Sequence, residues 1–66
     1  MVNRLKIERA IKNLTQDDLA KLIGVSRQTI NSIEKGRYVP STVLALKISK
    51  IFEKSVNEIF ELEEDD

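Results

Sequence analysis

Apolar residues recur every three or four positions along most of the chain, and only two glycines and one proline interrupt the pattern. This period is typical of amphipathic helices, whereas half-buried strands alternate every second residue. The pattern therefore predicts an all-α fold. We expect five helices, at about residues 4–12, 15–23, 26–35, 41–52 and 55–60.

Residues that favour helix ends stand at the predicted boundaries. The predicted N-caps are Thr15, Ser26, Ser41 and Ser55. Thr15 is followed three positions later by Asp18, which is the spacing of a capping box. Ser55 and Glu58 have the same spacing. Gly24 tolerates the left-handed conformation that commonly ends a helix, so a short turn is predicted between the second and third helices.

The third predicted helix has an unusual outer face. Ile30, Ile33 and Glu34 gather on one side of it, at 100° per residue. The other side carries cationic, amide and hydroxyl groups, where a solvated helix normally carries Glu and Lys. Arg pairs with guanine in the major groove, and Gln or Asn pairs with adenine. The order of helix, short turn and Ser-capped helix is that of a helix-turn-helix. By composition alone, a plain solvated face fits equally well.

Composition limits the other functions that are possible. The 66 residues suffice for one small domain, residues 1–66. The absence of cysteine and histidine removes disulfides, the commonest metal ligands and the commonest general base. We therefore expect no enzymatic activity, no metal, no cofactor and no small-molecule ligand. No apolar run approaches the roughly 20 residues of a membrane span, so we expect no membrane partner and a cytoplasmic location.

The zero net charge conceals an asymmetry. Residues 1–50 contain ten Lys or Arg and four Asp or Glu, a net charge of +6, and residues 51–66 have a net charge of −6. A basic body is compatible with a nucleic-acid partner. We interpret residues 61–66 as a solvated acidic tail.

The segment from Leu14 to Ser41, LTQDDLAKLIGVSRQTINSIEKGRYVPS, closely resembles the phage-repressor/Cro (Xre-like) helix-turn-helix family. The matching residues are Thr15, Gln16, Leu19, Ala20, Gly24, Val25, Ser26, Ile30, Ile33, Glu34, Gly36, Pro40 and Ser41. Residues 45–49 (ALKIS) and 57–60 (NEIF) are similar to the last two helices of the family. The likeness covers nearly the whole chain and is greatest to small stand-alone regulators. It implies a five-helix, lambda-repressor-like DNA-binding domain with the helix-turn-helix at about residues 15–35.

The resemblance also implies roles for individual residues. The base-reading positions are matched by Arg27, Gln28, Asn31 and Ser32. The positions that contact the DNA backbone are matched by Gln16, Ser26, Thr29, Lys35, Arg37 and Tyr38. A structural ion pair between Arg9 and Glu34 is implied between the first and third helices. Ser32 is short for a base reader, and Lys54 stands where the family often has an apolar residue.

The fourth predicted helix has more apolar residues than one face can hold. A core stripe is predicted at Ala45, Ile48, Ser49 and Phe52, and a second stripe at Leu44, Ile48 and Ile51. Two stripes indicate a second buried contact. We expect a two-fold homodimer through Leu44, Ile48, Ile51, Val56, Ile59 and Phe60, although a wide core-facing helix is the alternative.

The two ends of the chain allow two interpretations. Phe60 to Glu63 alternates apolar and acidic residues, and Met1 to Arg4 is short. Periodicity alone predicts a frayed tail, whereas the resemblance implies a two-stranded antiparallel ribbon between the termini.

The leading functional hypothesis is a transcriptional regulator that binds double-stranded DNA sequence-specifically. Under this hypothesis, we expect a dimeric repressor that places helix 26–35 in the major groove of a palindromic operator. The alternative hypothesis is an antitoxin-like or other protein-interaction module that binds a partner protein. The acidic tail and the second apolar stripe suggest it.

Overall fold

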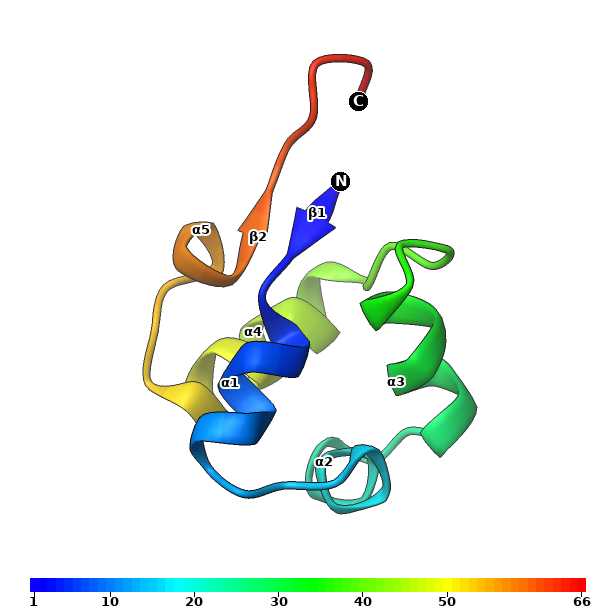
Figure 1. Ribbon diagram of the computed structural model, residues 1–66, viewed down its shortest axis with the longest axis vertical. Helices are drawn as coiled ribbons and strands as arrows, with labels where there is room; N and C mark the ends of the chain where they lie inside the picture. The colour runs from blue at the N-terminus through cyan, green and yellow to red at the C-terminus, as the bar shows by residue number, and fades with distance from the viewer.

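Five helices form the body of the molecule, and a short ribbon joins the two ends of the chain (Figure 1). The computed structural model describes residues 1 to 66. The helices are α1 (Leu5–Ile11), α2 (Gln16–Ile23), α3 (Arg27–Glu34), α4 (Thr42–Phe52) and α5 (Val56–Ile59), and the strands are β1 (Val2–Asn3) and β2 (Phe60–Glu61). The prediction of five helices is confirmed.

Local hydrogen bonds explain where α2 and α3 begin. The Thr15 hydroxyl accepts from the Asp18 N–H at 3.0 Å, and the Asp18 carboxylate accepts from the Thr15 N–H at 2.9 Å. The second of these bonds holds the pKa of Asp18 below its ordinary value. Gly24 ends α2 in the left-handed conformation (φ 74°), and Ser26 caps α3 by accepting from the Thr29 N–H at 3.1 Å. The predicted caps of the helix-turn-helix are therefore present.

Two helix ends lack a clear signal in the sequence. α4 ends where Glu53 takes the left-handed conformation (φ 54°), which non-glycine residues seldom adopt. Phe60, expected to end α5, is instead extended (φ −117°, ψ 138°) and lies opposite Asn3 in the ribbon. The strands β1 and β2 are antiparallel, so the ribbon implied by the resemblance is confirmed and the frayed tail is wrong at residues 60–61.

The apolar core draws on all five helices. Its buried members are Leu5, Leu19, Ala20, Ile23, Ile30, Ile33, Leu44, Ile48, Phe52, Ile59 and Phe60. α2 packs against both α3 and α4, and α5 packs against α4. The core stripe of α4 consists of Leu44, Ile48 and Phe52, spaced one turn apart. The predicted core positions Ala45 and Ser49 are only half-buried, because the packing of α4 turns Leu44 inward instead.

One carboxylate lies within this apolar environment. Glu8 is 3% exposed on the inner side of α1, one turn from Leu5. Its Oε2 atom accepts a hydrogen bond from the Lys54 ammonium at 2.8 Å. Lys54, noted above as a departure from the family pattern, thus neutralises a buried charge 46 residues away in the chain.

Replacing Lys54 with alanine is expected to lower the free energy of unfolding by about 1–3 kcal/mol, because the Glu8 carboxylate is left buried without its cation. Urea unfolding followed by circular dichroism measures the change. Lys21→Ala is the matched control, since the Lys21–Asp17 pair is exposed and should cost less than about 1 kcal/mol. Equal stability of Lys54→Ala and the parent protein would contradict the prediction.

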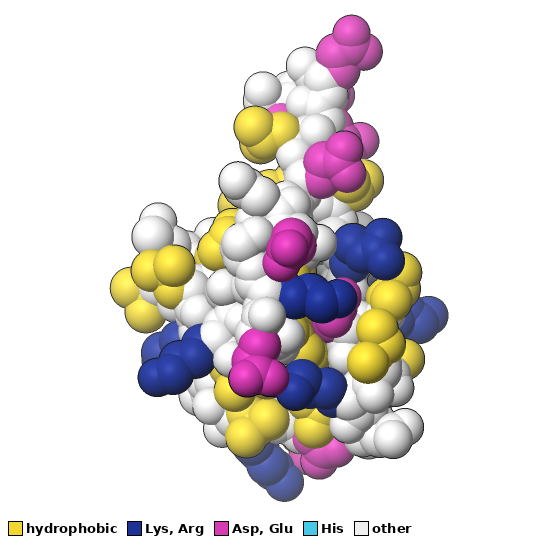
Figure 2. All heavy atoms as spheres, turned by 90° about the vertical axis from the view of Figure 1, so that its left-hand side faces the viewer, with side chains coloured by type: hydrophobic (Ala, Val, Ile, Leu, Met, Phe, Trp, Pro, Cys, Tyr) yellow, Lys and Arg dark blue, Asp and Glu magenta, His cyan; other side chains and the backbone are white.

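The acidic end of the chain lies beside the N-terminus. The Met1 ammonium is 2.7 Å from a Glu63 carboxylate oxygen and 2.9 Å from one of Asp66. Hydrogen bonds to these carboxylates raise the pKa of the ammonium above its ordinary value. Figure 2 shows the face away from α3, where acidic side chains follow the projecting end and basic and apolar side chains mix over the body. None of the helices combines the length and apolar character needed to cross a membrane.

Candidate nucleic-acid interface

α3 turns one face to the core and the other to solvent. Ile30 and Ile33 are buried against the rest of the body, as expected from their spacing. The four residues expected to read bases lie on the remaining surface: Arg27 and Gln28 are exposed, and Asn31 and Ser32 are half-buried. The polar surface of α3 is therefore held outward by its apolar side.

A polar hollow of 340 Å³ opens on this surface. It is lined by Ser26, Gln28, Thr29, Ser32, Arg37 and Tyr38. All six are among the expected DNA contacts. Gly36 is left-handed (φ 73°) and reverses the chain after α3, so that the loop at residues 37–38 lies against the helix. A side chain at Gly36 would be strained in this conformation.

Three cations border the same surface. Arg27, Lys35 and Arg37 are exposed, and none of them takes part in an ion pair. Arg27 begins α3, and the other two follow its end. Because their charges are not neutralised within the protein, they are available to an anionic partner.

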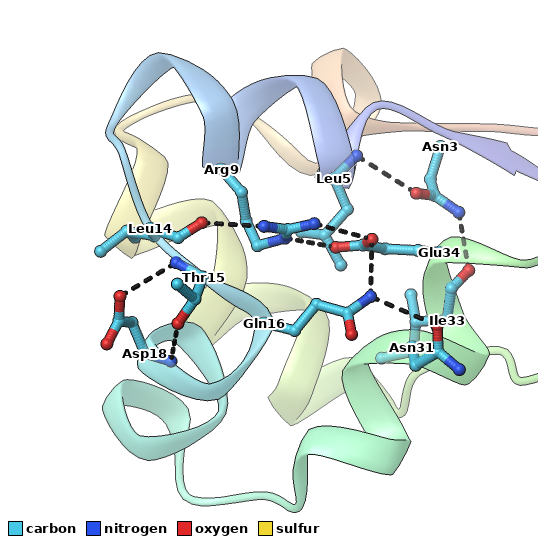
Figure 3. Close-up of polar contacts among 10 residues, drawn as sticks. All are labelled: Asn3, Leu5, Arg9, Leu14, Thr15, Gln16, Asp18, Asn31, Ile33 and Glu34. Carbon is cyan, nitrogen blue, oxygen red and sulfur yellow. Dashed lines mark hydrogen bonds and ion pairs between the residues drawn. The ribbon is translucent and has the colours of Figure 1, made fainter.

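A largely buried ion pair ties α1 to the end of α3 (Figure 3). The Arg9 Nε donates to Glu34 Oε2 at 2.6 Å, and Arg9 Nη2 donates to Glu34 Oε1 at 3.1 Å. Arg9 Nη1 also donates to the Leu14 carbonyl at 2.8 Å. The Glu34 carboxylate raises the pKa of Arg9 above its ordinary value. The expected pairing of Arg9 with Glu34 is present, and it fixes the position of α3.

Gln16 extends this network from α2 to the outer surface of α3. Its Nε2 donates to Glu34 Oε1 at 3.1 Å and to Asn31 Oδ1 at 3.3 Å. Figure 3 shows the Gln16 side chain lying between the ion pair and Asn31. Gln16 Nε2 therefore donates to two acceptors within the protein.

Sequence reasoning missed a second residue that holds α3. The Asn3 Nδ2 donates to the Ile33 carbonyl at 2.9 Å, and the Asn3 Oδ1 accepts from the Leu5 N–H at 3.1 Å. Asn3 thus joins β1, the start of α1 and the last turn of α3. The only signal in the sequence is an asparagine just before a helix, which reveals the local cap but not the distant carbonyl.

The residues expected at a dimer interface separate into two groups. Leu44, Ile48, Ile59 and Phe60 are buried in the core of the single chain, so they are largely unavailable to a second copy in this conformation. Ile51 and Val56 are half-buried. Exposed apolar surface lies instead around a hollow lined by Met1, Val39, Pro40, Thr42, Ala45, Leu46, Val56 and Phe60.

This arrangement of a capped helix pair with a polar second helix is shared with known proteins. The family model for helix-turn-helix domains matches residues 5–59. The chain belongs to the helix-turn-helix (Xre-like) family. An HTH-type transcriptional regulator of Methanocaldococcus jannaschii is 58% identical over 66 residues, which cover 100% of both chains. The HTH-type transcriptional regulator YgzD of Bacillus subtilis is 48% identical over 65 residues, 98% of each chain.

A solved structure shares the fold of this helix-turn-helix protein. The restriction-modification controller protein C.AhdI from Aeromonas hydrophila superposes with a TM-score of 0.77 at 33% identity, and 86% of each chain is covered. Helix-turn-helix regulators are non-enzymatic, so family membership confirms that the chain is not an enzyme. No group of three or more metal-ligating side chains is close enough to hold an ion.

Proposed function

We propose that the protein is a cytoplasmic transcriptional repressor that inserts α3 into the major groove of double-stranded DNA. The observation that carries the proposal is the polar hollow on α3, because all its lining residues are of types that contact bases or phosphates. Three unpaired cations beside it supply attraction to the phosphate backbone. Relatives named as transcriptional regulators support the same function.

Within this proposal the residues take the roles that the family resemblance implies for their positions. The readers of base edges are Arg27, Gln28, Asn31 and Ser32. The backbone contacts are Ser26, Thr29, Lys35, Arg37 and Tyr38. Phosphate contacts set affinity and register, whereas base-edge contacts set the preferred sequence.

Selection of bound sequences from a random DNA pool tests the proposal. A repressor with this interface is expected to enrich one short palindromic sequence, and Gln28→Ala should relax preference at one position in each half-site. Enrichment of no sequence over the starting pool would refute sequence-specific binding. A reporter gene carrying the selected sequence in its promoter then distinguishes repression from activation.

We further propose that two copies associate through the apolar hollow beside α4. Val39 and Leu46, on its rim, are 66% and 58% exposed, and a small domain gains stability from burying such surface. To bind two half-sites one turn of DNA apart, a two-fold dimer must hold its two α3 helices about 34 Å apart. Val56 and Phe60 of the expected set line this hollow, whereas Leu44, Ile48 and Ile59 are buried in the core of the single chain.

Leu46→Glu is expected to convert the dimer to a monomer, since it places a charge on the apolar surface that the second copy covers. Analytical ultracentrifugation measures the mass at micromolar concentration. Ile11→Glu is the matched control, because Ile11 is also an exposed apolar helix residue (66%) but lies on α1, outside the hollow. A Leu46→Glu protein that sediments as a dimer would contradict this interface.

A further inference from the structure

We propose that Gln16 determines which end of the Asn31 side-chain amide faces the DNA. It acts through a chain of hydrogen bonds that we call the orientation relay, formed by Arg9, Glu34, Gln16 and Asn31. The inference rests on the proposed function, because it concerns how α3 reads one base. It makes Gln16 a positioning residue instead of the phosphate contact that the family resemblance implies.

The relay begins at the Glu34 carboxylate, which can only accept hydrogen bonds. Glu34 receives two hydrogen bonds from the Arg9 guanidinium, which can only donate. Glu34 Oε1 also accepts from Gln16 Nε2 at 3.1 Å. Reversing the Gln16 amide would set its carbonyl oxygen against a carboxylate oxygen, which is repulsive. The chemistry of Glu34 therefore fixes Gln16 with its N–H groups inward.

The next step transfers this orientation to α3. The second N–H of Gln16 points to Asn31 Oδ1, at a distance of 3.3 Å between nitrogen and oxygen. If the Asn31 amide alone were reversed, its Nδ2 would face Gln16 Nε2, and both donors would lack an acceptor. The reversed orientation is therefore expected to be about 10-fold or more less populated. Asn31 Nδ2 makes no hydrogen bond within the protein, so it remains as a free donor on the surface that α3 presents.

This orientation has a consequence for base preference. In the major groove, purine N7, guanine O6 and thymine O4 accept hydrogen bonds, whereas cytosine presents only the N4 donor. An asparagine that turns freely adapts to cytosine by offering its oxygen. Asn31 held with Nδ2 outward cannot do so. We therefore expect cytosine to be disfavoured about 10-fold at the operator position that Asn31 reads.

Binding to a set of operators varied at each position tests the inference. Asn31→Ala first identifies the position that Asn31 reads. Gln16→Ala, which frees the Asn31 amide to turn, is expected to raise affinity for cytosine at that position to within about 3-fold of the other bases. Asn31→Asp keeps the shape but offers only acceptors, so it should reverse the preference toward cytosine. Gln28→Ala is the control, because Gln28 makes no side-chain hydrogen bond in the protein and should alter a different position.

The outcomes separate the relay from a simpler role. If Gln16→Ala weakens binding to all operators alike, Gln16 is a phosphate or packing residue and the inference is overturned. If the parent protein selects no sequence at all, the proposed function falls, and base reading by Asn31 falls with it. A measurement without DNA checks the relay directly by NMR. The side-chain amide protons of Gln16 should exchange with solvent more slowly than those of Gln28, and equal rates would overturn the relay.

Discussion

Replacing Glu34 with alanine is expected to lower the free energy of unfolding by about 3–5 kcal/mol, because Arg9 then keeps a buried charge without its partner. The two side chains are only 14% and 7% exposed, so solvent screens the lost interaction poorly. A chain of 66 residues has a total stability of about 3–10 kcal/mol. The variant should therefore be partly or wholly unfolded at 37 °C, as measured by thermal and urea unfolding.

Two controls show whether the loss comes from the unpaired charge. Asp17→Ala removes the exposed carboxylate that pairs with Lys21, and is expected to cost less than about 1 kcal/mol. Replacing both members of the buried pair, as Arg9→Met with Glu34→Leu, should recover much of the stability, since apolar pairs of similar volume often substitute well. If Glu34→Ala unfolds within 1 kcal/mol of the parent protein, the ion pair does not hold α3.

Affinity for the selected operator is expected to fall about 100-fold when salt rises from 50 to 200 mM. Lys35 and Arg37 from two protomers would release counterions at four phosphates, which gives a log–log slope of about −3.6. The exposure of both side chains and their lack of ion pairs make full charges available for this contact. Fluorescence anisotropy over a salt series measures the slope.

Lys35→Ala should weaken binding to every sequence alike and reduce the slope by about 1.8, since a dimer loses two phosphate contacts. Gln28→Ala should leave the slope unchanged while relaxing one base preference, so it serves as the control for a side chain that reads bases. Affinity that does not respond to salt would mean that the cations around α3 do not touch phosphates.

The parts of the fold that were predicted correctly depend on near neighbours in the chain. Thr15 and Asp18 lie three residues apart, and Gly24 follows α2 directly, so their capping roles could be inferred from spacing alone. Glu53 shows the limit of this reasoning. Its left-handed conformation ends α4 without a glycine or asparagine. The N–H groups of Glu53 and Lys54 both donate to the Ser49 carbonyl at this end, a closure that no residue type in the sequence signals.

The candidate site was predicted less completely than the helices. Composition indicated the polar face of α3, and the family resemblance added Ser26, Arg37 and Tyr38; six of these residues line one hollow. The hydrogen bond between Gln16 and Asn31 was not foreseen, nor was the contact of Asn3 with the Ile33 carbonyl. Both join segments at least 15 residues apart, and their geometry requires the helices to be placed first.

The sequence by itself determined the number of helices, the N-caps of α2, α3 and α4 and the polar face of α3, because each depends on side chains within one or two turns of one another. The resemblance added the ribbon and the Arg9–Glu34 pair. Only the tertiary structure decided which apolar side of α4 enters the core, because that depends on its rotation against α2 and α5. The rotation buries Leu44 and leaves Leu46 exposed. The exposed apolar surface of α4 therefore lies at the hollow that Leu46 lines.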